Sequence, residues 1–180
     1  KYKISHAQPL PPAPRLRFVG PSGTGKTTVA RILAQYLYGL GLLQTTELVE
    51  TTGAALKAGY LGQTAGKVVE KFAEARGGVL FIDEAYGVAP DGHGDSYGQE
   101  ALATLISECT RDENLGTVVV LAGYEDAIDT MLYANEGLGE RFPDTVRFEH
   151  MSNDALAGVA RSWASQQGLH LGEGFAELLG

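Results

Sequence analysis

The most informative stretch of the sequence is residues 20–27, which read Gly-Pro-Ser-Gly-Thr-Gly-Lys-Thr. It matches the pattern G-x-x-x-x-G-K-[ST], whose glycines let the backbone wrap around a phosphate with its N–H groups pointing inward. The apolar run at residues 16–19 predicts a strand before it, and the spacing of apolar residues over 27–40 predicts an amphipathic helix after it. In this context the stretch predicts a phosphate-binding loop rather than an ordinary glycine-rich turn.

The loop contains the groups that a nucleoside triphosphate needs. Lys26 would bring a positive charge to the β- and γ-phosphates, and the Thr27 hydroxyl would bind Mg²⁺. The N-terminus of the following helix adds a partial positive charge. The residues expected to bind the nucleotide here are Gly20, Pro21, Ser22, Gly23, Thr24, Gly25, Lys26, Thr27 and Thr28.

A second strand ends in two acidic residues. Residues 79–84 read Val-Leu-Phe-Ile-Asp-Glu, a continuous apolar run that is typical of a strand covered on both faces. Acidic residues often follow strands simply as loop starts or helix caps. After a complete phosphate loop, however, we expect Asp83 to hold Mg²⁺ and Glu84 to orient and deprotonate the attacking water. The pair therefore indicates hydrolysis as well as binding.

Strands and helices alternate along the chain, which predicts an α/β fold with a mostly parallel sheet and helices on both faces. Together with the phosphate loop, this pattern resembles the three-layer αβα arrangement of P-loop NTPases. The patterns predict strands at 16–19, 47–51, 79–82, 117–121 and 146–148, and helices at 27–40, 65–76, 99–110, 153–167 and from 174 onward. Residues 1–14 hold four of the seven prolines, so we interpret them as a linker or arm, or as a result of where the piece was cut.

Composition excludes several classes of protein. No apolar run approaches the ~18–20 residues that span a bilayer, so we expect no membrane partner. The net charge of −8 argues against a nucleic-acid partner, and a single cysteine, Cys109, cannot form an internal disulfide. We therefore expect a cytoplasmic protein, or one of the plastid stroma or nucleus in a eukaryote. The chain has no initiator Met and reads as a piece of something longer.

Six stretches together resemble the AAA+ ATPases, and within them the CbbX/CfxQ group, which includes the stage V sporulation protein K type. The phosphate loop alone would indicate only a P-loop NTPase, but GGVLFIDEAY, YGQEA and LAGY in this order are much more specific. The resemblance covers about residues 15–150. The stretches are residues 20–43, 49–68, 77–88, 97–106, 118–129 and 135–142.

This resemblance implies a set of further expectations. Residues 15–150 would form the large AAA+ subdomain, and residues 151–180 would be the truncated start of a helical lid. The cofactors would be ATP and Mg²⁺. Arg141 would be an arginine finger that reaches the γ-phosphate held by a neighbouring subunit. The partner would then be a second copy of the chain, in a homo-oligomer that forms a hexameric ring in the full-length protein.

Two aromatic residues also take expected roles from the resemblance. Tyr60-Leu61-Gly62 matches the central-pore loop that grips a polypeptide substrate, although an ordinary packed tyrosine is an equally good interpretation of Tyr60 without it. Tyr124 follows Gly123 where many AAA+ proteins have a polar sensor residue, and the CbbX-like group shares this Gly-Tyr. The phenol of Tyr124 would therefore lie beside the nucleotide.

Two functions follow from these observations. The first is a ring-forming ATPase that remodels a protein partner, with Rubisco activation as a specific role that only the resemblance implies. The second is a nucleotide-switched scaffold with little turnover, which Glu84 and Arg141 disfavour. Cys109 lies on the apolar side of the helix predicted over 99–110, and we interpret it as a structural thiol.

Overall fold

The computed structural model describes residues 12–57, 63–90 and 95–169. The chain divides into two compact units, Lys1–Phe148 and Glu149–Gly180. Tyr60, Leu61 and Gly62 of the expected pore loop lie outside the described residues. None of the helices in the described ranges combines the length and the apolar character that a bilayer crossing requires.

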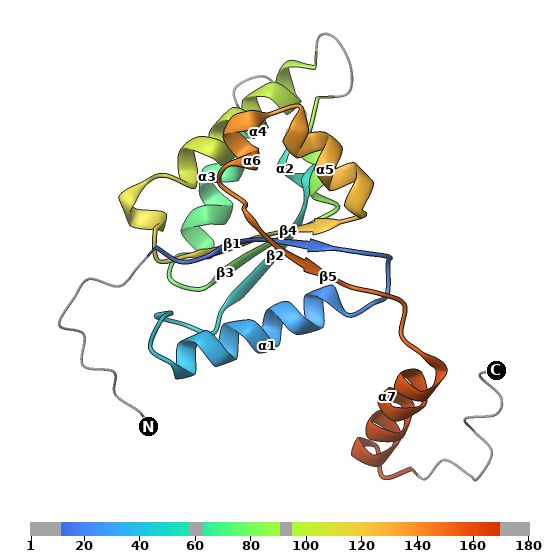
Figure 1. The fold of residues 1–180 in the computed structure, drawn as a ribbon. Coiled ribbons are helices and arrows are strands. Elements are labelled where there is room, and N and C mark those ends of the chain that lie inside the picture. The colour runs from blue at the N-terminus through green and yellow to red at the C-terminus, as the bar shows by residue number, and fades with distance from the viewer. Residues whose placement is uncertain (1–11, 58–62, 91–94, 170–180) are drawn as a thin grey trace. The chain divides into compact units, whose positions relative to one another are not determined.

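The first unit is built on a five-stranded sheet in the order β2-β3-β4-β1-β5, and every strand pair is parallel (Figure 1). Each strand expected from the sequence is present. The bounds are β1 (Arg15–Val19), β2 (Leu48–Thr52), β3 (Val79–Asp83), β4 (Val118–Gly123) and β5 (Asp144–Arg147). The parallel α/β fold is thus confirmed.

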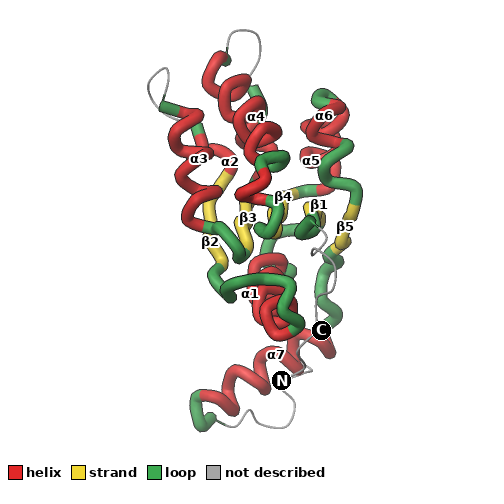
Figure 2. The backbone as a smooth tube through the Cα atoms, turned by 90° about the vertical axis from the view of Figure 1, so that its left-hand side faces the viewer, coloured by secondary structure: helices red, strands yellow, loops and turns green. Residues whose placement is uncertain are grey.

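Helices cover both faces of this sheet, as Figure 2 shows from the side. One face carries α1 (Lys26–Gly39). The other carries α2 (Gly53–Leu56), α3 (Thr64–Glu74), α4 (Ser96–Glu108), α5 (Glu125–Tyr133) and α6 (Glu136–Gly139), with two 3₁₀ turns, η1 (Ala85–Val88) and η2 (Asp112–Asn114). Helices α2, α5 and α6 were not expected from the sequence. In the second unit, α7 (Asn153–Gln166) is capped by Ser152, whose hydroxyl accepts from the Ala155 N–H at 3.2 Å.

Alternation within the central strands produces two cores. Leu80 and Ile82 of β3 pack under α2–α6, whereas Val79 and Phe81 pack against α1. All six residues of β4 are buried. Because both faces need apolar side chains, these strands read as unbroken hydrophobic runs in the sequence.

The buried face of α1 differs from the one that the sequence predicts. Val29, Ile32 and Tyr36 belong to the apolar spacing over residues 27–40 that predicts this helix, yet they are 39%, 59% and 64% exposed. Ala30 and Ala34 are fully buried instead. Small side chains let the helix approach the sheet closely, so the closest contact runs along the alanines and turns the larger residues outward.

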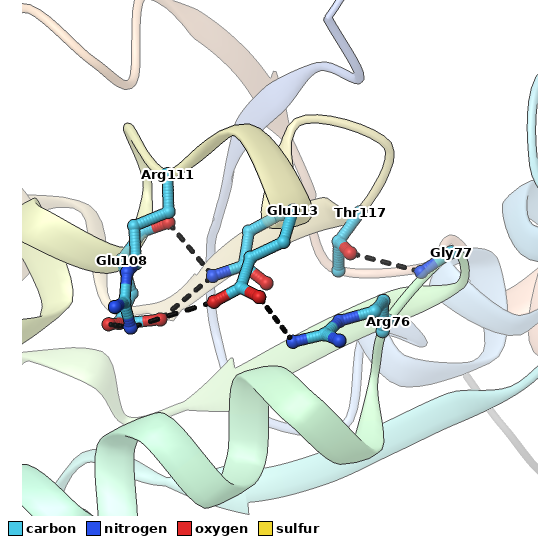
Figure 3. Close-up of polar contacts among 7 residues, drawn as sticks. Arg76, Gly77, Glu108, Arg111, Glu113 and Thr117 are labelled. Atoms are coloured by element: carbon cyan, nitrogen blue, oxygen red, sulfur yellow. Dashed lines mark hydrogen bonds and ion pairs between the residues drawn. The ribbon is translucent and has the colours of Figure 1, made fainter.

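At the amino edge of the sheet, where the strands begin, polar groups pair with one another (Figure 3). The buried Glu108 carboxylate accepts from Arg111 Nη1 and Asn114 Nδ2, both at 2.8 Å. The Thr117 hydroxyl accepts from the Gly77 N–H at 3.1 Å. The Arg15 guanidinium donates to the carbonyls of Ala13, Cys109, Asn114 and Thr117. This network ties α4 and η2 to the strands.

Candidate functional site

At the opposite, carboxyl edge of the sheet, the loops after three neighbouring strands meet. β4 lies between β1 and β3, and the Gly20 N–H extends the β1–β4 pairing by donating to the Gly123 carbonyl at 3.0 Å. The loops enclose a cavity of about 310 Å³. It is lined by Gly20, Ser22, Gly23, Gly25, Lys26, Thr27, Thr28, Asp83, Glu84, Tyr86, Gly123 and Tyr124. Parallel α/β sheets bind ligands at this edge.

The loop over residues 20–27 depends on glycine for its shape. Gly23 and Gly25 have φ angles of 76° and 90°, in the left-handed region that glycine enters without steric cost. Gly20 has a φ of 146°, and a Cβ there would stand 2.1 Å from the Phe148 carbonyl oxygen. These glycines allow the chain to turn sharply from β1 into α1.

The N-terminus of α1 opens toward the cavity without a cap. Gly25 is its N-cap residue, so no side chain accepts a hydrogen bond there, and the first turn holds no acidic residue. The first N–H groups of a helix have no partner within it and carry a partial positive charge. An anion is the ligand that satisfies both conditions.

Lys26 adds a full positive charge at the same place. The residue is only 8% exposed, and its ammonium donates to the carbonyls of Gly20 at 2.8 Å and Pro21 at 2.7 Å. An ammonium has three donors, so one is left for a ligand. Pro21 and Thr24 do not line the cavity; instead the Pro21 carbonyl also accepts from the Thr24 hydroxyl at 2.9 Å, which braces the loop.

The two acids that follow β3 lie on the wall of this cavity. Asp83 Oδ1 accepts from the Glu84 N–H at 2.9 Å, and no other hydrogen bond to this carboxylate occurs within the described part of the chain. The Glu84 carboxylate is exposed and makes no hydrogen bond or ion pair with a described residue. Thr27 and Asp83 line the same cavity, and a hydroxyl and a carboxylate fit Mg²⁺ when phosphate and water oxygens complete its shell.

Two tyrosines form the remaining wall. The rings of Tyr86 and Tyr124 stack with centroids 6.5 Å apart. Burial, followed by the charge of Glu84, raises the pKa of the Tyr86 hydroxyl, which stays neutral and able to donate. A Cβ on Gly123 would stand 2.9 Å from Cε1 of Tyr86, so the ring occupies the space of a side chain at 123. Tyr86 was not expected at the site from the sequence, although it follows the two acids in the motif DEAY.

Arg141 lies apart from this cavity. It comes just before Asp144, the first residue of β5, which pairs with Leu16 near the start of β1. That places Arg141 toward the amino edge, whereas the phosphate loop follows the carboxyl end of β1. Its Nη1 donates to the Gly137 carbonyl, and its Nε is buried without a hydrogen-bond partner in the described ranges. The chain's own cavity therefore does not include Arg141.

Comparisons with known proteins agree with this geometry. Residues 16–149 match the family described as "ATPase family associated with various cellular activities (AAA)". The chain is 45% identical over 152 residues to the ESX-1 secretion system protein EccA1 of Mycobacterium leprae (strain TN), which covers 83% of this chain and 26% of that protein.

Two further relatives resemble the same part of the chain. EccA1 of Mycobacterium tuberculosis (strain ATCC 25618 / H37Rv) is 44% identical over 83% of this chain and 26% of its own length. The ESX-3 secretion system protein EccA3 of Mycobacterium leprae (strain TN) is 37% identical over 86% of this chain and 24% of its own length. The chain thus spans about a quarter of the length of these relatives. The AAA part of the resemblance is confirmed, and these relatives are EccA proteins rather than CbbX proteins. The chain belongs to the AAA ATPase family.

Proposed function

We propose that this chain is the ATP-binding and ATP-hydrolysing module of a ring-forming ATPase that remodels a protein partner. One observation carries the proposal. A single cavity combines an uncapped helix N-terminus and a nearly buried lysine after β1 with two acids at the end of β3, the next strand but one. Anion binding needs the first two features, and hydrolysis needs the acids.

The residues divide the chemistry among them. The loop N–H groups and Lys26 hold the phosphates. Thr27 and Asp83 would hold Mg²⁺, which supplies positive charge to the phosphate oxygens. The exposed Glu84 carboxylate, unpartnered in the described ranges, is free to orient a water and take its proton.

The position of Arg141 supports a site completed by a second subunit. At the amino edge, Arg141 does not reach the cavity of its own chain. An arginine that stabilises charge on a transferring phosphoryl group can come from a neighbouring molecule, and such a finger contributes about 10³–10⁵ in rate. We therefore propose a homo-oligomeric ring, in its full-length form a hexamer, whose subunits each complete the next subunit's site.

The remodelling role rests on the resemblance and the relatives. Residues 151–180 would begin a helical lid, and Tyr60-Leu61-Gly62 would grip the partner polypeptide in the central pore. The relatives named above are secretion system proteins, so we favour a role beside a secretion system over Rubisco activation.

The first experiment replaces Glu84 with Gln in the full-length protein. Loss of the base is expected to lower ATP turnover about a hundredfold or more. ATP affinity is expected to change less than about twofold, because the phosphate loop is intact. Turnover and equilibrium binding of a fluorescent ATP analogue measure the two effects. Turnover that equals that of the wild type would contradict hydrolysis by Glu84 and support the nucleotide-switched scaffold.

The second experiment tests whether Arg141 serves a neighbouring site. Arg141→Ala is expected to remove turnover and to keep ATP binding. Mixing it with Glu84→Gln subunits is expected to restore part of the activity, because a Glu84→Gln subunit still offers Arg141 to an intact Glu84 next to it. Arg76→Ala removes an exposed arginine from the same edge and serves as the control. Absence of rescue in mixtures would contradict a shared site.

A further inference from the structure

The backbone of Glu84 adopts an unusual conformation. Its φ and ψ are both 45°, and it is the one residue other than glycine with a positive φ in the described part of the chain. A left-handed backbone is sterically unfavourable for a residue with a Cβ, so it persists only where the surroundings hold it in place. The residues that hold this turn therefore also set the direction of the Glu84 side chain.

Gly53, the first residue of α2, lies in close contact with the backbone of this turn. A Cβ built on Gly53 would stand 2.6 Å from the Glu84 carbonyl oxygen, 2.7 Å from the Val88 nitrogen and 2.8 Å from the Ala85 carbonyl oxygen. All three are backbone atoms, which cannot move aside as the end of a flexible side chain can. Any side chain at 53 would displace the turn that follows Glu84.

Gly87 of η1 lies equally close to the backbone of α2. A Cβ on Gly87 would stand 2.9 Å from the Ala54 nitrogen, and the Gly87 N–H donates to the Glu84 carbonyl at 2.8 Å. Neither Gly53 nor Gly87 has a positive φ. Both positions thus require glycine for space and not for backbone conformation.

We propose that Gly53, together with Gly87, is a positioning residue for ATP hydrolysis: their close backbone contact holds the turn that directs the Glu84 carboxylate into the phosphate cavity. This inference rests on the function proposed above. The contact joins the ends of β2 and β3 beside the acids, whereas the phosphate loop follows β1. Its loss should therefore affect turnover far more than nucleotide binding.

The first test is Gly53→Ala in the full-length protein. A displaced base is expected to lower kcat about tenfold to a hundredfold, because misplacing a reacting group by about 1 Å costs that much. ATP affinity is expected to stay within about twofold. The control is Gly66→Ala in α3, where an added Cβ meets nothing within 4 Å, and its kcat is expected to match that of the wild type.

A double-substitution cycle separates positioning from a general loss of packing. Residual hydrolysis is measured by single-turnover assays in Glu84→Gln and in Gly53→Ala/Glu84→Gln. If Gly53 acts through the carboxylate, adding Gly53→Ala to Glu84→Gln lowers the rate no further. An equal loss in both backgrounds, or an unchanged kcat in Gly53→Ala alone, would overturn the inference.

The remaining outcomes are also decisive. Equal turnover of Glu84→Gln and the wild type would refute the proposed function itself, which distinguishes that failure from a failure of Gly53. Should Gly53→Ala not fold, Gly87→Ala carries the same cycle with a milder clash. If neither variant folds, the contact serves the fold rather than the direction of Glu84, and the inference is overturned.

Discussion

At the amino edge of the sheet, Glu108 is 4% exposed, and its two carboxylate oxygens accept from Arg111 and Asn114. At the carboxyl edge, the exposed Glu84 carboxylate has no partner among the described residues. The arginine and lysine of the two edges differ in the same way. Arg15 donates to four carbonyls, while Lys26 keeps one donor for a ligand. A polar group whose bonds are complete supports the fold, and one whose bonds are incomplete at a cavity is available for chemistry.

If this contrast is correct, Lys26→Ala should have the largest effect of the substitutions below. It should weaken ATP binding and leave the stability of the fold nearly unchanged. The variant loses a charge-assisted hydrogen bond to phosphate, so ATP affinity should fall about tenfold to a hundredfold. The midpoint of urea unfolding without nucleotide should change little. Titration with a fluorescent ATP analogue measures affinity, and Lys71→Ala, which removes a lysine paired with Glu74 on α3, is the control. Unchanged affinity would refute the assignment of the phosphate loop.

Glu108→Ala should show the reverse behaviour. Without the Glu108 carboxylate, the Asn114 amide and the Arg111 guanidinium lose their buried acceptor. The free energy of unfolding should therefore fall by about 2 kcal/mol. ATP affinity should not change. Urea unfolding measures the loss, and Glu74→Ala, at an exposed ion pair, should cost less than about 1 kcal/mol. A stable Glu108→Ala protein with weakened ATP binding would contradict the division between the edges.

Gly123→Ala should have a smaller effect on stability than Glu108→Ala, and this effect should arise at the carboxyl edge of the sheet. The new methyl group would lie 2.9 Å from Cε1 and 3.0 Å from Cδ1 of Tyr86, so the ring must shift, at a cost of about 1 kcal/mol. The stack with Tyr124 should be disturbed, which near-ultraviolet circular dichroism detects. Gly116→Ala, where nothing lies within 4 Å, should leave the spectrum unchanged. An identical spectrum for Gly123→Ala would show that Tyr86 is not wedged over Gly123.

Cys109 gives the mildest test of the amino edge. Burial raises the pKa of its thiol to about 11, from an ordinary value of 9.0, with the Arg15 charge opposing part of that shift. The unfolded thiol ionises near pH 9 while the folded one keeps its proton, so this contribution to stability is complete below about pH 9 and is lost as the pH rises toward 11. Unfolding of the wild type should therefore depend more steeply on pH in this range than that of Cys109→Ala.

Iodoacetamide alkylation offers a second measurement on the same thiol. At pH 8 the folded protein should react far more slowly than the unfolded chain, because the thiolate is the reactive form. Equal rates would show that Cys109 is not protected by the fold.

Some elements were easy to find in the sequence and others were not. The strands β3 and β4 are continuous apolar runs, and α3 and α4 repeat apolar residues at helical spacing, so each is visible locally. The four-residue helices α2 and α6 are too short to show any period. α5 was missed although Glu125 and Asp126 in its first turn are a helix-start signal.

The sequence by itself determined the glycine-rich loop of residues 20–27 and the acids after β3, because glycine spacing, a lysine at a helix start and carboxylates at a strand end are local chemistry. Only the tertiary structure decided which groups share the cavity, because the parallel order of β3, β4 and β1 brings their carboxyl ends together. The same strand order places the Tyr86 ring against Gly123 and places Gly53 against the turn that follows Glu84. It also places Arg141 toward the amino edge of the sheet. These are contacts between residues far apart in the chain, and no local pattern encodes them.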